Sequence, residues 1–312
     1  MIEGTEGIDS VLLVGFGGPE RPDDVMPFLW RVTEGRGVPE TRLAEVAHHY
    51  DVIGGRSPYN EMALALAGAL AATLASRGRP LPVRTGMRNW HPFVADTLAE
   101  MNAAGLRRAA GVILASHRCE ASHDRYERDV AAARAAGSLR IRVSYPPPWF
   151  DDERFLEAAA QRIEQGSGIR RGAWPASVPL IFTAHSIPEP MARAAPYERE
   201  LDASCAGVAA ILKPPSWRLA YQSASGGGRA PWLGPDITQV LPECAAAGAR
   251  QVVVNAIGFL TDHVEVLYDL DVEAAALARE LGLTLTRTPC VGAHPLFFAM
   301  LADRILAMPE EA

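Results

Sequence analysis

Short apolar runs alternate along the chain with longer segments of helical periodicity. The run VLLVGF at residues 11–16 is apolar almost throughout, and a Gly-Gly-Pro turn closes it. An apolar run of this length that ends in turn residues is typical of a strand buried on both faces of a sheet. Comparable runs predict further strands at 83–87, 110–115, 139–144, 178–184, 217–222 and 251–257.

Helical segments lie between these strands. They are predicted at 23–32, 41–52, 60–76, 93–104, 122–136, 152–165, 197–212, 235–247, 261–281 and 294–308. Strands that alternate with helices indicate parallel sheets joined by right-handed crossovers. We therefore expect an α/β protein with two similar halves, each a parallel sheet flanked by helices, and an active-site cleft between them.

A proline run, YPPPWF at residues 145–150, falls near the middle of the chain. Exposed proline-rich segments commonly connect domains. We therefore place the boundary there, with an N-terminal half at 1–148 and a C-terminal half at 149–312. The last predicted helix, 294–308, is the segment that could pack back on the N-terminal half.

The composition narrows the classes of function. The 312 residues are 48% hydrophobic and 21% charged, as in globular proteins, and the net charge of −7 leaves no basic field for nucleic acid. No apolar stretch is long enough to cross a bilayer, and the first ten residues are acidic without an apolar core, so we expect a cytoplasmic protein. The four cysteines are scattered without CxxC spacing, which predicts neither a disulfide framework nor a zinc knuckle.

A histidine lies at the end of one predicted strand. In LIFTAHSIPEP, residues 180–190, apolar residues lead through Thr183 and Ala184 to His185, and Pro188 ends the run. Ligands of open α/β sheets bind just outside the carboxyl ends of the strands, so this position suits a reacting group. Many loop histidines are simply hydrogen-bonded, and His185 taken alone leaves both interpretations open.

A row of carboxylates follows another predicted strand, in GFLTDHVEVLYDLD at residues 258–271. If a helix begins near residue 261, four carboxylates at spacings of three and four share one face: Asp262, Glu265, Asp269 and Glu273. Such a row is either a solvated face or a cation site, for which oxygen ligands suit a hard or borderline divalent ion. Because the row begins at the sheet edge that holds His185, one histidine facing several carboxylates would suit ferrous iron.

These motifs resemble those of the ferrochelatases, the enzymes that insert ferrous iron into a porphyrin in haem synthesis. The similarity runs from VLLVGFGGPE near the start to HPLFFAMLADRIL in the last helix, and its strongest motifs are FTAHSIP, YQSASGGGRAPWLGPDI and GFLTDHVEVLYDLD, in family order. The resemblance implies two Rossmann-like, chelatase-type halves with the tetrapyrrole in the cleft. It implies porphyrin and ferrous iron as partners, and no cofactor beyond the iron that is inserted.

The family's residues carry over to this chain position by position. His185 matches the metal-site and proton-accepting histidine, and Glu265 matches the carboxylate that faces it across the porphyrin, so these two are the implied catalytic pair. Asp269 and Glu273 match the acidic ridge that holds or conducts incoming metal. The resemblance also implies substrate contacts or active-site support from Phe16, Ser57, Arg88, Trp232, Asp262 and His263.

The chemistry fits those residue types, because a porphyrin must lose its pyrrole protons as the metal enters. A neutral His185 can take a proton or hand over iron but not both at once, and the resemblance leaves its role open. The aromatic residues Trp232, Trp149 and Phe16 could supply flat contacts to the ring or could equally be core residues.

Some features depart from parts of the family. Certain members have tyrosine at the positions of Phe16 and Phe150, so any role of those hydroxyls does not transfer. The loop 225–229, SGGGR, is rich in glycine, which predicts mobility. Some relatives hold a [2Fe-2S] cluster through one internal cysteine and three in a C-terminal extension. This chain ends at Ala312 without that extension, and the predicted helix 152–165 holds no cysteine, so we expect no cluster.

The resemblance leaves the porphyrin open between protoporphyrin IX and coproporphyrin III. The stretches FGGPERPDDVMPFL and GMRNWHPFVADTL are closest in style to actinobacterial enzymes, many of which take coproporphyrin III. Arg36, Arg56 and Arg88 are candidates for discriminating between propionate and vinyl groups. The alternatives are a cobalt or iron chelatase acting on a sirohydrochlorin-type ring, and a non-catalytic tetrapyrrole or metal carrier of the same fold. We expect a monomer that could bind a haem-acceptor protein transiently.

Overall fold

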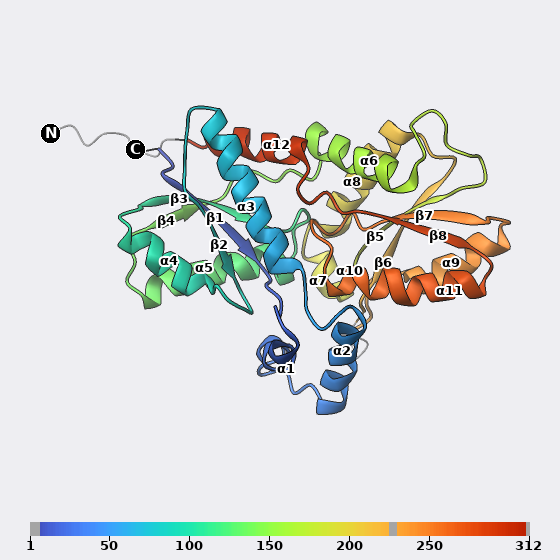
Figure 1. Cartoon of the computed structure of the whole chain (residues 1–312), viewed down its shortest axis with the longest axis horizontal. Coiled ribbons are helices and arrows are strands. Elements are labelled where there is room, and N and C mark those ends of the chain that lie inside the picture. Colours follow the sequence, from blue (N-terminus) through green and yellow to red (C-terminus); the bar gives the residue numbers. More distant parts are fainter. Residues whose placement is uncertain (1–6, 225–229, 310–312) are drawn as a thin grey trace.

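The computed structural model describes residues 7–224 and 230–309, and Figure 1 shows how its helices and strands are arranged. Two parallel sheets lie side by side, each flanked by helices. The loop 225–229, for which the sequence predicts mobility, lies outside the described residues. Within the described ranges, no helix is both long enough and apolar enough to span a membrane.

The first sheet is built from the N-terminal part of the chain. Its strands β1 (Ser10–Gly15), β2 (Val83–Met87), β3 (Arg108–Ile113) and β4 (Arg142–Ser144) pair in parallel in the order β2-β1-β3-β4. All of β1 is buried because it is a central strand. The helical elements around this sheet are η1 (Pro22–Asp24), α1 (Val25–Val32), α2 (Glu40–Val52), α3 (Tyr59–Ser76), α4 (Val94–Ala103), the π-helical turn η2 (Glu120–Asp124) and α5 (Arg125–Ala136).

The second sheet repeats this arrangement. Its strands β5 (Leu180–His185), β6 (Trp217–Gln222), β7 (Gln251–Asn255) and β8 (Thr284–Thr288) pair in parallel in the order β6-β5-β7-β8. The helical elements are α6 (Glu153–Ser167), α7 (Glu189–Arg193), α8 (Tyr197–Leu212), α9 (Ile237–Ala246), α10 (Val264–Leu267), the π-helix η3 (Asp269–Ala274), α11 (Ala275–Glu280) and α12 (Pro295–Leu306). The corresponding strand orders confirm the predicted α/β fold with two similar halves.

Two elements of the second half are absent from the sequence-based prediction. Strand β8 has the sequence TLTRT, and it is mostly half-buried because it lies at the edge of its sheet. Its polar residues interrupt the apolar run that marks a buried strand. Helix α7 has five residues, which is too short to show a helical period.

Helix α12 joins the two halves. It packs against α3 of the first half and α6 of the second, and its Phe297 is fully buried. The Phe297 ring lies 6.2 Å, centroid to centroid, from the rings of both Trp149 and Phe155. Trp149 is therefore a core residue rather than a flat contact for a ligand. The domain boundary between residues 148 and 149 stays a prediction.

Candidate active site

The candidate site lies where the strands of the second sheet end. Strand β5 delivers His185 as its last residue. After β7 the chain crosses the end of β5, where the N–H of Gly258 donates to the carbonyl of Thr183 at 3.0 Å. A Cβ at position 258 would lie 2.6 Å from the Cβ of Ala184, which is a clash. Glycine is therefore required for the loop that leads from β7 to Glu265.

The imidazole of His185 is held at both of its nitrogens. Nδ1 contacts the main-chain carbonyl of Ser186, and because a carbonyl oxygen accepts hydrogen bonds, Nδ1 carries the donated proton. Nε2 lies 3.3 Å from Oε1 of Glu265. A ring fixed in this way presents Nε2 as the atom for proton transfer or metal binding. The main-chain carbonyl of His185 in turn accepts a hydrogen bond from the hydroxyl of Tyr197 at 2.9 Å.

The electrostatics of this pair favour the charged forms. Burial lowers the pKa of His185, but Glu265, the Ser186 carbonyl and Asp269 outweigh it and raise the pKa to about 9. Burial raises the pKa of Glu265, while the positive charge of His185, together with a smaller effect of the adjacent His263, lowers it to about 2. Near neutral pH the substrate-free pair is an imidazolium facing a carboxylate. The two side chains remain 31% and 38% exposed, so a ligand can reach them.

The start of α10 positions Glu265. His263 is the N-cap of this helix, and its Nδ1 accepts the N–H of Glu265 at 3.4 Å. The amide of Gln222 donates to the main-chain carbonyl of Glu265 at 2.5 Å. Burial, assisted by the positive charge of His185, lowers the pKa of His263 despite the nearby Glu265. His263 is therefore a neutral capping residue that orients the carboxylate.

The predicted acidic ridge, Asp269 and Glu273, lies on the π-helix η3. The N–H of Glu273 donates to the carbonyl of Tyr268, five residues earlier, at 3.0 Å. Such π-helical turns are rare and frequently occur at functional sites. The hydroxyl of Ser223 donates to the carboxylate of Asp269. Burial raises the pKa of Asp269 to about 7 although the Ser223 hydrogen bond lowers it, and the negative charges of Glu265 and Glu273 act in the same direction as burial.

Asp262 does not belong to this row, which corrects the predicted single helical face. Helix α10 begins at Val264, so Asp262 precedes it. One oxygen of Asp262 lies 3.0 Å from the guanidinium of Arg287, and the other accepts the N–H of Cys290 at 3.3 Å. Arg287 also contacts Asp271 at 2.7 Å. Asp262 therefore ties the loop before α10 to β8 and the segment that follows it.

The first half supplies the facing wall of the site. Phe16, just after β1, is 39% exposed, and its N–H donates to the hydroxyl of Tyr59 at 3.0 Å. The ring of Tyr59 meets the ring of His263 edge-on at 5.9 Å. From α2, His49 stacks on Tyr268 with ring centroids 3.7 Å apart and planes at 7°. These contacts place the site at the junction of the two halves, where α2 lies close to α10 (Figure 1).

Two further predicted substrate contacts have defined positions. Trp232 forms an antiparallel bridge with Pro188, which places it beside the strand end that holds His185. Ser57 is 5% exposed, and its Oγ accepts the N–H of Tyr59 at 3.2 Å. Ser57 thus satisfies the main-chain N–H of the first residue of α3.

Positively charged side chains gather on the first half around Arg88. Arg88 forms an ion pair with Asp129 and lines a cavity of about 260 Å³. Arg36 is exposed in the structure; partial desolvation lowers its pKa, the positive charges of Arg125 and Arg88 lower it further, and the negative charge of Glu120 acts in the opposite direction. Arg125 is paired with Glu120 at 2.8 Å, whereas Arg36 forms no ion pair within the described ranges.

A sequence model of the ferrochelatase family matches residues 9–308 of this chain, which is nearly its whole length. The chain belongs to the ferrochelatase family. The ferrochelatase of Rhodopirellula baltica is 41% identical over 299 residues, which cover 95% of this chain and 85% of that protein. The coproporphyrin III ferrochelatase of Frankia alni is 42% identical over 316 residues, covering 96% of this chain and 79% of the relative.

Solved structures show the same fold at low identity. SirB from Bacillus subtilis, determined with Fe³⁺, superposes with a TM-score of 0.60 over 96% of this chain and 94% of SirB, at 14% identity. The multi-domain protein DR2241 from Deinococcus radiodurans, described as structurally similar to chelatases, gives a TM-score of 0.51 over 97% of this chain and 55% of DR2241, at 15% identity. This ferrochelatase-family chain therefore shares the chelatase architecture.

The ligands of this ferrochelatase-family site are arranged openly. Among the described residues, no three His, Cys, Asp or Glu side chains converge to hold a metal. Closed sets of ligands retain a metal, whereas incomplete sets leave positions for other ligands.

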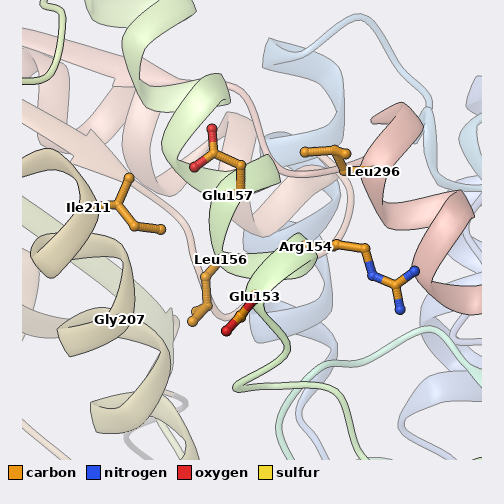
Figure 2. A pocket seen from close by; sticks show the side chains of 7 residues that line it. All are labelled: Glu153, Arg154, Leu156, Glu157, Gly207, Ile211 and Leu296. Atoms are coloured by element: carbon orange, nitrogen blue, oxygen red, sulfur yellow. The ribbon is translucent and has the colours of Figure 1, made fainter.

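A groove on another face carries none of the predicted site residues. It lies between α6, α8 and the start of α12, and its volume is about 490 Å³ (Figure 2). Its lining residues are Glu153, Arg154, Leu156, Glu157, Gly207, Ile211 and Leu296. Arg154 is already paired with Asp152 and Asp303, and Glu157 with Arg171 at 2.8 Å, so these two charged side chains of the groove are engaged elsewhere.

Several residues that shape the ferrochelatase-family site have no motif of their own: Tyr197, Tyr59, His49 and Arg287. Tyr197 follows a proline at the start of a predicted helix, but nothing in that local pattern indicates its hydrogen bond to His185. His49 and Arg287 contact partners far away in sequence, so no local pattern could reveal them.

Proposed function

We propose that this member of the ferrochelatase family inserts ferrous iron into coproporphyrin III, with His185 and Glu265 acting at the centre of the ring. The observation that carries the proposal is the pair itself, whose Nε2 and Oε1 atoms are 3.3 Å apart at the junction of the halves. Metal insertion needs a proton acceptor and a transient metal ligand at one point. A partly exposed imidazole facing a carboxylate supplies both.

The protons and charges of the reaction balance at this pair. A free-base porphyrin holds two N–H bonds at its centre, and both break as the ring nitrogens bind Fe²⁺, so two protons leave for each divalent ion. Glu265 is ionised in the free protein and can accept one of them. A ring seated between the two groups would separate them, weaken their attraction and so lower the pKa of His185. As its pKa falls, His185 loses its proton to solvent, and the freed Nε2 could then accept the second pyrrole proton. Where Nε2 binds iron instead, the second pyrrole proton leaves to solvent.

The acidic ridge supports delivery of the metal. Asp269 and Glu273 lie on the helix that carries Glu265, and Asp269 has a pKa raised to about 7 by burial and by its acidic neighbours. Metal binding to such a carboxylate displaces a proton. We infer that Fe²⁺ passes along these carboxylates to the catalytic pair.

Two observations support coproporphyrin III as the ring. Relatives in Frankia alni, Mycolicibacterium vanbaalenii and Streptomyces griseus, 40–42% identical to this chain, bear the name coproporphyrin III ferrochelatase. Coproporphyrin III has propionates where protoporphyrin IX has vinyls, so it needs more cationic contacts. Arg36, close to two other guanidinium groups and without an ion-pair partner among the described residues, suits an anionic ligand.

The three arginines considered from the sequence differ in whether an ion pair already occupies the guanidinium. Arg56 lies at the surface and pairs with Glu61 at 3.3 Å. Arg88 is paired with Asp129. Arg36 is therefore the strongest candidate for binding a propionate that protoporphyrin IX lacks.

The test is anaerobic iron insertion, followed by the collapse of the free-base absorption bands, with each porphyrin in turn. We expect coproporphyrin III to be metalated faster than protoporphyrin IX, and Arg36→Ala to reduce that preference. Arg56→Ala is the matched control and should leave the preference unchanged. Faster metalation of protoporphyrin IX would contradict the assignment of the ring. Tight binding without metalation of either would favour a carrier, or a different metal and ring.

We also propose that this chain, a lyase by reaction class, works as a cytoplasmic monomer. The facing groups His185, Glu265, Phe16 and Tyr59 all come from one chain, so the site needs no second copy. The four cysteines are unpaired and buried, which suits a reducing compartment where iron stays ferrous.

A further inference from the structure

We propose that helix α8 couples the first half of the molecule to His185, and that Tyr197 is a positioning residue that holds this histidine by its main chain. The inference rests on the proposed function of His185, and it adds residues that no motif assigns. Its basis is a continuous set of hydrogen bonds from the loop after β3, residues 116–119, through α8 to the end of β5.

The first contact joins α8 to the catalytic histidine. Tyr197 is the first residue of α8, and its hydroxyl donates to the carbonyl of His185 at 2.9 Å. Tyr197 is 5% exposed, and burial raises its pKa well above the ordinary value, so the hydroxyl remains a donor. This carbonyl belongs to His185 itself, so the hydrogen bond holds the main chain that carries the imidazole. A shift of α8 would therefore move the imidazole.

The second contact joins α8 to the first half. Glu200, three residues after Tyr197, is fully buried. Its carboxylate accepts hydrogen bonds from the main-chain N–H of Arg118 at 2.8 Å and from Nε of Arg118 at 2.7 Å, and the guanidinium forms an ion pair with it. A buried carboxylate needs such partners, so this contact is strongly constrained in geometry.

The third contact lies one turn further along α8. Nε2 of His117 is 2.9 Å from the hydroxyl of Ser204, and that hydroxyl donates to the carbonyl of Phe150 at 2.6 Å. Because the serine proton is already donated, His117 is the donor to Ser204. Burial lowers the pKa of His117 to about 3, so the imidazole is neutral.

The three residues of α8 lie on one face of a single helix. Tyr197, Glu200 and Ser204 follow at spacings of three and four, and all are buried. The loop 116–119 begins three residues after the end of β3, and His185 ends β5, so α8 connects segments near the strand ends of the two sheets. These hydrogen bonds of α8 determine the position of the His185 imidazole relative to the first-half residues that face it.

The primary test compares Tyr197→Phe with Tyr145→Phe. The hydroxyl of Tyr145 is buried and forms no hydrogen bond, so its removal is a matched control. We expect Tyr197→Phe to lower kcat for iron insertion about 10- to 100-fold, the usual cost of losing a group that orients a ligand residue. Its KM for coproporphyrin III, and the dissociation constant from fluorescence quenching, should stay within about twofold of the wild type because the ring contacts other groups.

A second variant tests the anchor in the first half. Glu200→Gln keeps the side-chain volume and an acceptor for the N–H of Arg118 but removes the charge. We expect it to lower kcat as well, whereas the control Glu243→Gln, in a surface pair with Arg218, should not. The double variant Tyr197→Phe/Glu200→Gln should lose less than the product of the two single effects, because both act through α8.

The outcomes separate this inference from the proposed function. A wild-type enzyme that metalates coproporphyrin III, together with equal kcat in the two tyrosine variants, would overturn the inference alone. Multiplicative losses in the double variant would also overturn it. Failure of the wild type to metalate any porphyrin would overturn the proposed function itself.

Discussion

At the scale of single residues, two opposing influences determine the charge of His185. Burial favours the neutral imidazole, and the carboxylate of Glu265 favours the imidazolium and prevails. Ser186 fixes Nδ1 as a donor, so Nε2 is the nitrogen that faces Glu265. In the free protein the pair is therefore an imidazolium facing a carboxylate.

Replacing Glu265 should therefore change the titration of His185. In Glu265→Gln we expect the pKa of His185 to fall well below about 9, because the charge that offsets burial is removed. NMR titration of the imidazole carbon-bound protons measures this. The pKa of His294, which caps α12 and does not contact the pair, should stay where it is. A His185 pKa that remains near 9 would show that Glu265 is not its main partner.

The same pair should make the free energy of unfolding depend on pH. The pKa of His185 rises from 6.5 to about 9 on folding, so its contribution is complete below pH 6.5 and is lost as the pH rises through about 9. The pKa of Glu265 falls from 4.5 to about 2 on folding, so its contribution is complete above pH 4.5 and is lost as the pH falls through about 2. The stability difference between wild type and Glu265→Gln should be largest from pH 4.5 to 6.5. Urea denaturation that shows a difference growing above pH 6.5 would contradict this.

Single residues were predictable from the sequence where a motif carried them. His185 and Glu265 lie in FTAHSIP and GFLTDHVEV, and the structure places them face to face. Tyr197 and Arg118 contribute through contacts that depend on tertiary packing, so they could not be read from a local pattern.

At the scale of elements, the acidic helix is the least regular part of the site. It begins at Val264, passes through the π-helix η3 and continues as α11. The α-helical period predicted Asp262 on its face, but that period does not reveal a cap at His263 or a π turn. The ridge consequently starts at Glu265, and Asp262 is held by Arg287.

Removing the ridge should weaken capture of the metal. In Asp269→Ala/Glu273→Ala we expect the apparent KM for metal to rise about tenfold, in the range for altered groups around a metal site. The KM for the porphyrin should not change. Steady-state assays with varied Fe²⁺ or Zn²⁺ measure this, and Glu280→Ala, an exposed carboxylate at the end of α11, is the control. An unchanged KM for metal would leave Asp269 and Glu273 as a solvated face.

At the scale of the whole molecule, two similar sheets are held together by α12 as well as by α8. Asp303 of α12 forms ion pairs with Arg77, the C-cap of α3, and with Arg154 of α6, one from each half. Beneath them, Phe297 is fully buried against Trp149. The alternation of apolar runs and helices predicted the two parallel sheets. It could not predict the strand order, nor how the last helix spans both halves, because these depend on contacts distant in sequence.

The apolar contacts of α12 should matter more than its ion pairs. Phe297→Ala should lower the free energy of unfolding by about 3–5 kcal/mol, since it opens a cavity in the core. Asp303→Ala should cost about 1 kcal/mol or less, because these charges are half-exposed and screened by solvent. Urea denaturation compares the two variants. A larger loss in Asp303→Ala would mean that charge, rather than packing, holds the halves together.

The central claim is that the pair of His185 and Glu265 performs the metalation, and one measurement tests it most directly. Coproporphyrin III is bound to the wild type and to His185→Ala, ferrous iron is added without oxygen, and a single turnover is followed by stopped-flow absorbance. We expect the free-base bands to collapse to the metalated spectrum in the wild type. They should persist in His185→Ala, even though fluorescence quenching shows that the porphyrin is bound. Metalation by His185→Ala at the wild-type rate would contradict the account.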